Sequence, residues 1–241
     1  MPTYETIAKL LNDNQGVLGV SVFIATLFFG WLSGIFAALR RKPKLKIHLI
    51  MGPTFCCTYP TGVMRDAYPI HRTGFALYLR VSNIGSAASS LESIQVGYHC
   101  NLRPKSIQWL RFRIGWFWLN DQIAAIHDFQ SKIGENVKLY PFLTQASSVS
   151  GKSADTFLIP GQSTNGVVYF EQSDSWGGFF PFVGKHGVRV KVAIKDTFGI
   201  RHTAKFMIPA VTMDRARTYN PSFGKTLAEL RNEKLPYDTC A

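Results

Sequence analysis

Acidic side chains and cysteines are scarce in this sequence, and only one apolar run is long. The 241 residues include 15 Asp and Glu against 27 Lys and Arg, which gives a formal net charge of +12. The four cysteines form no CxxC pair and no disulfide framework, so we expect reduced thiols. An HExxH motif is absent, and residues 161–165 lack the second glycine of a nucleophile elbow. The sequence therefore assigns no catalytic residue, metal ligand or cofactor, and an enzyme is not expected.

The apolar run, residues 16–39, contains no charged side chain. As a helix it would extend about 36 Å, slightly more than the roughly 30 Å hydrocarbon core of a bilayer. Basic residues follow it at once: Arg40, Arg41, Lys42, Lys44 and Lys46. They form a juxtamembrane segment over residues 40–46, suited to anionic lipid headgroups. A cleavable signal sequence is disfavoured, because its charges would precede the run.

The same basic residues predict the orientation of the anchor. Short basic segments stay on the cytoplasmic side of a membrane. We therefore expect residues 1–15 outside a bacterial-type inner membrane and the rest of the chain after residue 46 in the cytoplasm. This makes the chain a single-pass membrane protein.

Small residues recur every four positions inside the run and place a stripe on one helix face. They are Thr26, Gly30, Gly34 and Ala38. Such a stripe allows two helices to approach closely in lipid, so it predicts a homo-oligomer formed through the membrane helix. Small residues are also common in unpaired membrane helices, and that alternative stays open.

After the anchor, apolar and polar residues alternate, as they do along 75–82 and 188–195. Alternation of this kind is typical of antiparallel strands with one wet face. Eight or nine short strands predict a cytoplasmic β-sandwich or a small β-barrel over residues 47–210. Helices are expected at 121–129, and at 213–219 and 225–233 in a helical tail that spans 211–241.

One segment concentrates tryptophan between basic residues. Its members are Trp109, Arg111, Phe112, Arg113, Trp116, Phe117 and Trp118. Tryptophan and arginine together suit the membrane–water interface, because an indole ring is mostly apolar and a guanidinium reaches headgroups. A strand whose aromatic rings are buried in the protein core is the other interpretation. The segment is thus a candidate surface for membrane or partner contact.

Two further stretches, 103–113 and 185–205, hold most of the remaining positive charge. A basic surface near the cytoplasmic leaflet suits anionic lipid, so nucleic acid is not expected as a partner. The leading hypothesis is a non-catalytic binding or sensing module beside the membrane, with an unknown protein or small ligand. By architecture alone, the chain also resembles membrane effectors of bacterial anti-phage signalling, whose ligand-driven oligomerisation perturbs the bilayer. A membrane-tethered hydrolase of unknown substrate is the third hypothesis.

The orientation predicts that a reporter fused after Ala241 lies in the cytoplasm. Alkaline phosphatase fused there should be inactive, whereas β-galactosidase fused at the same residue should be active. Strong phosphatase activity, or a mature amino terminus near residue 40, would contradict the uncleaved anchor and its direction.

Overall fold

The computed structural model describes residues 9, 12–34, 41–104, 106–123, 125–145 and 154–225. The chain divides into two compact units, Met1–Lys42 and Pro43–Ala241. The first unit contains the helix α2, Gln15–Leu32, whose 18 residues correspond to about 27 Å. In the described part of the chain, α2 alone is long and apolar enough to cross a membrane. A membrane anchor and a signal sequence both have this character.

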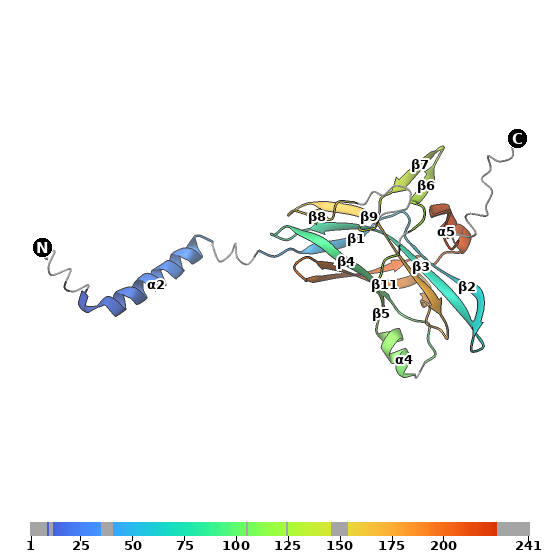
Figure 1. Cartoon of the computed structure of the whole chain (residues 1–241), viewed down its shortest axis with the longest axis horizontal. Helices are drawn as coiled ribbons and strands as arrows, with labels where there is room; N and C mark the ends of the chain where they lie inside the picture. Colours follow the sequence, from blue (N-terminus) through green and yellow to red (C-terminus); the bar gives the residue numbers. More distant parts are fainter. Residues whose placement is uncertain are drawn as a thin grey trace. The chain divides into compact units, whose positions relative to one another are not determined.

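The second unit is built from antiparallel β-strands, as the sequence predicts (Figure 1). One sheet has the order β1-β3-β2, with β9 also paired to β3. Its strands are β1 (Leu45–Leu49), β2 (Phe55–Arg65), β3 (Tyr68–Asn83) and β9 (Ser163–Ser175). We call it the first sheet.

The second sheet has the order β10-β11-β4-β5, with β12 paired to β11 and β8 paired to β4. Its strands are β4 (Ser89–Tyr98), β5 (Phe117–Leu119), β8 (Phe157–Leu158), β10 (Val183–Gly184), β11 (Gly187–Asp196) and β12 (Arg201–Ile208). A separate hairpin joins β6 (Phe129–Ile133) to β7 (Asn136–Tyr140), and α5 (Met213–Tyr219) follows the last strand. The predicted helix at 213–219 is therefore confirmed.

The two sheets pack face to face around the main core. Phe75 of β3 stacks on Tyr98 of β4, with ring centroids 5.2 Å apart. The Tyr98 hydroxyl donates to the Gln172 side chain and lies 3.1 Å from the Phe179 carbonyl oxygen. Along one edge the sheets also meet, because the Leu45 amide of β1 donates to His202 Nδ1 of β12 at 3.3 Å. The domain is thus a sandwich that is closed along one edge, like half of a barrel.

The first sheet is covered on its other face as well. A second core cluster contains Ala76 and Tyr78 of β3, Phe129 of β6 and Ala216 of α5. The prediction of one wet face is therefore wrong for β3. In the second sheet, alternation along β11 directs Val188, Val190, Val192 and Ile194 inward to the main core.

The helix predicted at 121–129 is wrong: its described residues are irregular up to Phe129, where β6 begins. Backbone bonding to β9 explains the difference. The Ile123 amide donates to the Tyr169 carbonyl at 3.2 Å, and the Gln145 side chain donates to the Ile123 carbonyl. The Ile123 carbonyl is thereby used outside a helix, in which it would accept from the amide of residue 127. Of the helix predicted at 225–233, all but Lys225 lies outside the described residues.

Asn83, fully buried at the end of β3, connects several segments. Its side-chain amide donates to the carbonyls of Ala87 at 2.7 Å and Leu158 at 3.0 Å. Its side-chain oxygen accepts from the amides of Gly85 at 3.0 Å and Lys44 at 3.4 Å. One side chain therefore joins the entry of β1, the loop after β3, and β8.

Replacing Asn83 by Ala should lower the free energy of unfolding by about 3 kcal/mol, because several buried polar groups lose their partner. Asn165→Ala is the matched control. Asn165 is exposed and donates one bond, 2.7 Å to the Tyr78 hydroxyl, so its loss should stay below about 1 kcal/mol. Urea unfolding of a fragment beginning at Pro43 measures both, and equal losses would contradict the role of Asn83.

Candidate functional site

The aromatic segment folds as a helical turn that leads into the short strand β5. The turn is α4 (Ile107–Trp109), which continues as the π-helix η1 (Leu110–Ile114). Ser106 caps it, because its hydroxyl accepts from the Trp109 amide at 2.9 Å. Polar capping residues of this kind favour a helix start.

The predicted segment is divided between core and surface. Phe112 and Phe117 pack against the main core, with their ring centroids 5.5 Å apart. Trp109, Trp116 and Trp118 are only half-buried. The core interpretation thus applies to the two phenylalanine rings, and membrane or partner contact by the segment stays a prediction.

The most exposed apolar side chains of this segment are ones that the sequence analysis did not single out. Ile107, Leu110 and Ile114 are 87%, 61% and 59% exposed. Leu110 and Ile114 follow Ile107 by three and seven residues, a spacing that places all three side chains on one face of the helical turn. We call these three residues the apolar ridge. Arg103 and Arg111, both exposed, flank them in the sequence.

Trp116 and Trp118 lie on the outer face of the second sheet. Trp118 covers Gly97 of β4, where an added Cβ would lie 3.0 Å from the indole. The Trp116 ring stacks against His99, with 4.1 Å between centroids. A side chain at position 97 would displace the indole. The absence of a side chain at Gly97 therefore leaves the space that the Trp118 ring occupies.

Cations from β11 and β12 stand beside these two rings. The Arg201 guanidinium lies 4.5 Å from the Trp118 ring centroid, and the Lys191 ammonium lies 5.8 Å from it. Lys205 lies 6.0 Å from the Trp116 centroid. We call the outward-facing Arg189, Lys191, Arg201 and Lys205, with Trp116 and Trp118, the basic face. Among the described residues, no carboxylate forms an ion pair with these four cations.

A groove of about 470 Å³ lies between the helical turn and the edge of the basic face. The helical turn lines it with Trp109, Arg113 and Ile114, and the sheet lines it with His99, Phe182, Gly184, Gly187, Arg189 and Met207. The groove thus combines apolar side chains with two arginines.

His99 lines this groove, in surroundings that disfavour its imidazolium form. Its Nδ1 donates to the Gly115 carbonyl at 2.7 Å, which leaves Nε2 as the acceptor of the neutral ring. Burial lowers the pKa of His99, and the nearby cations Arg189, Arg113 and Lys205 lower it further. The electrostatic environment of the groove is therefore positive.

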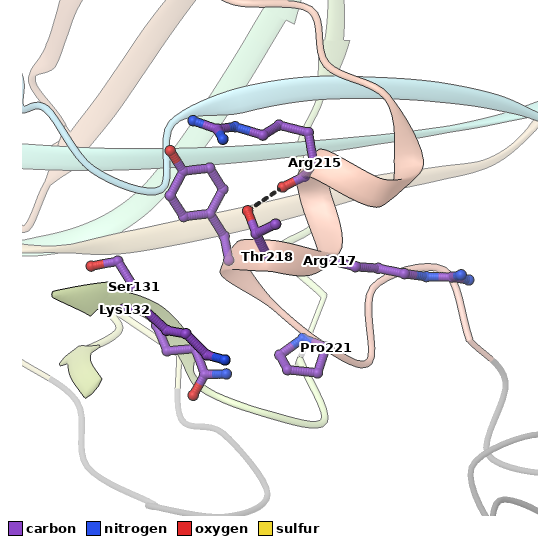
Figure 2. Close-up of a pocket in the computed structure, with 8 residues that line it drawn as sticks. Ser131, Lys132, Arg215, Arg217, Thr218 and Pro221 are labelled. Atoms are coloured by element: carbon purple, nitrogen blue, oxygen red, sulfur yellow. Dashed lines mark hydrogen bonds between the residues drawn. The ribbon is translucent and has the colours of Figure 1, made fainter. Parts of the chain in front are cut away.

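A second cavity, of about 610 Å³, lies between the β6–β7 hairpin and α5. Lys132, Arg215 and Arg217 contribute to its lining, but Figure 2 shows the two arginines leaving α5 in different directions. Arg215 lies 5.7 Å from the Tyr219 ring centroid, and Arg217 Nε donates to the Phe223 carbonyl at 3.2 Å. The arginines therefore do not converge on one anion here.

The predicted membrane-helix stripe is only partly on α2. Thr26 and Gly30 lie within it, and the Thr26 hydroxyl donates to the Val22 carbonyl at 2.8 Å. Gly34 lies beyond the last helical residue, with φ of 75°, a conformation that commonly ends helices at glycine. Ala38 lies outside the described residues. Helix pairing through this stripe stays a prediction.

The predicted headgroup residues that the structure describes are all exposed. They are Arg41, Lys42, Lys44 and Lys46. Lys46 belongs to β1, and Lys44 directly precedes β1 and donates its amide to Asn83. The backbone of both residues is therefore held by the domain. Arg40 lies outside the described residues.

The described cysteines are buried free thiols. Burial raises the pKa of Cys57 to about 11 and that of Cys100 to about 12, and it raises the pKa of Cys56 further. These thiols stay protonated at neutral pH and are poor nucleophiles. The described residues contain no group of three His, Cys, Asp or Glu side chains placed to hold a metal ion.

No protein-family model and no curated protein matches this chain. Among solved structures, it is similar to the Salmonella enterica trimeric lipoprotein SadB, with 13% sequence identity. The match covers 83% of this chain and 83% of that chain, with a TM-score of 0.21. Function must therefore be argued from the surface described above.

Replacing Arg189 by Gln should raise the pKa of His99, because a nearby positive charge that disfavours the imidazolium is removed. NMR titration of the imidazole in the fragment from Pro43 measures the change. Lys195→Gln is the control, since Lys195 pairs with Glu92 at 2.7 Å and is not among the cations acting on His99. An unchanged pKa in the Arg189 variant would contradict the electrostatic coupling.

Proposed function

We propose that this chain is a single-pass membrane protein whose cytoplasmic domain is a non-catalytic binding module held against the inner face of the membrane. The observation that carries the proposal is the apolar ridge, which is exposed to solvent and borders a basic face. An exposed apolar group beside cations suits an anionic lipid surface, because acyl chains receive the apolar residues and headgroups receive the charges.

The tether between α2 and the domain supports contact with the same membrane. Between Leu32, the last residue of α2, and Leu45, the first of β1, lie twelve residues, 33 to 44. A chain of that length spans at most about 40 Å. The domain therefore stays near the bilayer, and a weak surface interaction gains from the high local concentration of lipid.

The energetics of the ridge are consistent with such a weak interaction. Full burial of one large apolar side chain contributes roughly 1.5–3 kcal/mol, and each cation near an anionic membrane contributes about 1 kcal/mol. Partial insertion of three side chains, with two or three cations, gives a dissociation constant on the order of 0.1 mM. The ridge would thus orient the domain, while α2 would provide permanent attachment.

A role in binding rather than catalysis is favoured by the composition of the surface. Aromatic rings and cations dominate the basic face, and His99, which lines the adjoining groove, is bonded to a carbonyl rather than to a Ser or Cys side chain. Nucleophilic catalysis requires a nucleophile beside a base. The module would therefore recognise a ligand or a protein partner at the membrane without transforming it.

Replacing Ile107, Leu110 and Ile114 together by Ser should weaken binding of the fragment from Pro43 to anionic vesicles. Losing about 3 kcal/mol of apolar contact corresponds to about a 100-fold lower affinity. Flotation with phosphatidylglycerol vesicles measures the affinity. The melting temperature should stay close to that of the unmodified fragment, because the replaced side chains are exposed.

The β6–β7 hairpin supplies a matched control. Its residues Ile133, Val137 and Leu139 are 59%, 53% and 59% exposed, and the hairpin lies at the opposite side of the domain from α4 (Figure 1). The same three replacements to Ser there should leave flotation unchanged. Equal loss in both variants, or normal flotation of the ridge variant, would reject the ridge as the membrane contact.

A further inference from the structure

The groove between the helical turn and the basic face has the chemistry of a ligand site. Its two arginines come from different elements, Arg113 from η1 and Arg189 from β11. The Arg113 guanidinium carbon lies 3.2 Å from the centroid of the Phe182 ring. A guanidinium stacked by its face keeps its N–H groups in the plane, where they can donate to a phosphate. Among the described residues, no carboxylate pairs with either arginine.

The same groove has an apolar side that continues onto the apolar ridge. Trp109, Phe182 and Met207 line it beside the arginines. Ile114 belongs to both the groove and the ridge. A ligand in this groove can therefore contact both arginines and apolar side chains, and Ile114 connects the groove with the ridge.

We propose that the groove binds one anionic phospholipid, with its phosphate between Arg113 and Arg189 and an acyl chain passing over Ile114. The inference rests on the proposed function, because the bilayer at the ridge supplies the lipid. The groove would add a defined headgroup site to a surface that would otherwise distinguish lipids only by their charge. The module would then respond to the lipid composition of the leaflet as well as to its presence.

Gly184 of β10 allows the groove to be filled without disturbing the fold. An added Cβ there would meet Gly187 at 3.6 Å and Phe182 at 3.7 Å, which are ordinary contacts, and its backbone lies outside the left-handed region. Gly184→Leu therefore places an apolar side chain in the ligand's position. Thr203→Leu is the matched control, since Thr203 is exposed on β12 of the same sheet and does not line the groove.

Native mass spectrometry of the full chain in a neutral maltoside detergent measures the binding. Dioleoyl phosphatidylglycerol is the probe, and glycerol phosphate tests a free phosphate ester. Gly184→Leu should weaken phosphatidylglycerol binding at least tenfold, and Arg189→Gln should weaken it about tenfold through the lost charge-assisted bond. Thr203→Leu should bind as the unmodified chain does. Glycerol phosphate should bind at least 100-fold more weakly, because it lacks the acyl chains.

Phosphatidylglycerol binding that is unchanged in Gly184→Leu would overturn the groove site. Glycerol phosphate binding as tightly as the lipid would overturn a lipid ligand and assign a soluble phosphate ester instead. The two proposals fail separately. Vesicle flotation that depends on the ridge, with lipid binding insensitive to Gly184→Leu, rejects only the groove. Absent flotation, with lipid binding that is sensitive to Gly184→Leu, rejects only the membrane-contacting ridge.

Discussion

The arrangement of this domain depends on which sheet faces have to be covered. Apolar side chains on a sheet must be buried against another layer. The first sheet has apolar residues on both faces, so the second sheet covers one and the β6–β7 hairpin and α5 cover the other. The second sheet buries the apolar side chains of its inner face in the main core, while its outer face carries cations together with Trp116, Trp118 and Met207. Cations and indole rings are therefore displayed on the outer face of the second sheet, and they form the candidate functional surface.

The sequence was informative where one face of a strand is charged. Alternation sets Arg189 and Lys191 against valines along β11, and Arg201 and Lys205 against Phe206 and Ile208 along β12, and both strands were predicted correctly. It was less informative for β3, because Tyr78 combines an apolar ring with a hydroxyl and suits either a wet or a buried face. Residues 121–129 have helix-compatible composition, but a neighbouring strand offers their backbone better partners. Backbone pairing of this kind is a long-range property that local composition does not contain.

The candidate surface shows the same limit. Tryptophan and arginine indicated a segment whose residues Trp109 and Arg113 line the groove, and that segment stays a candidate surface. The spacing of Ile107, Leu110 and Ile114 is a helical signal that the sequence analysis did not interpret. The placement of Trp118 over Gly97 involves a strand about twenty residues earlier in the chain. Beside the helical turn, the groove is lined by His99 after β4, by residues 182–189 around β10 and β11, and by Met207 of β12. A site assembled from four distant segments could not be read from any one of them.

The hydrogen bonds at the start of β1 also determine how a pulling force would enter the domain. Lys44, the last residue of the tether, donates its amide to Asn83 of β3, and Leu45, the first residue of β1, donates its amide to His202 of β12. His202 in turn bonds to Asp196 at 2.9 Å, at the turn between β11 and β12. A force directed along β1 acts parallel to the strand, so the five residue pairs between β1 and β3 are loaded in shear. All five pairs then resist the force together. A force on the chain that precedes β1 therefore reaches both layers of the sandwich, the first sheet through Asn83 and the second sheet through His202.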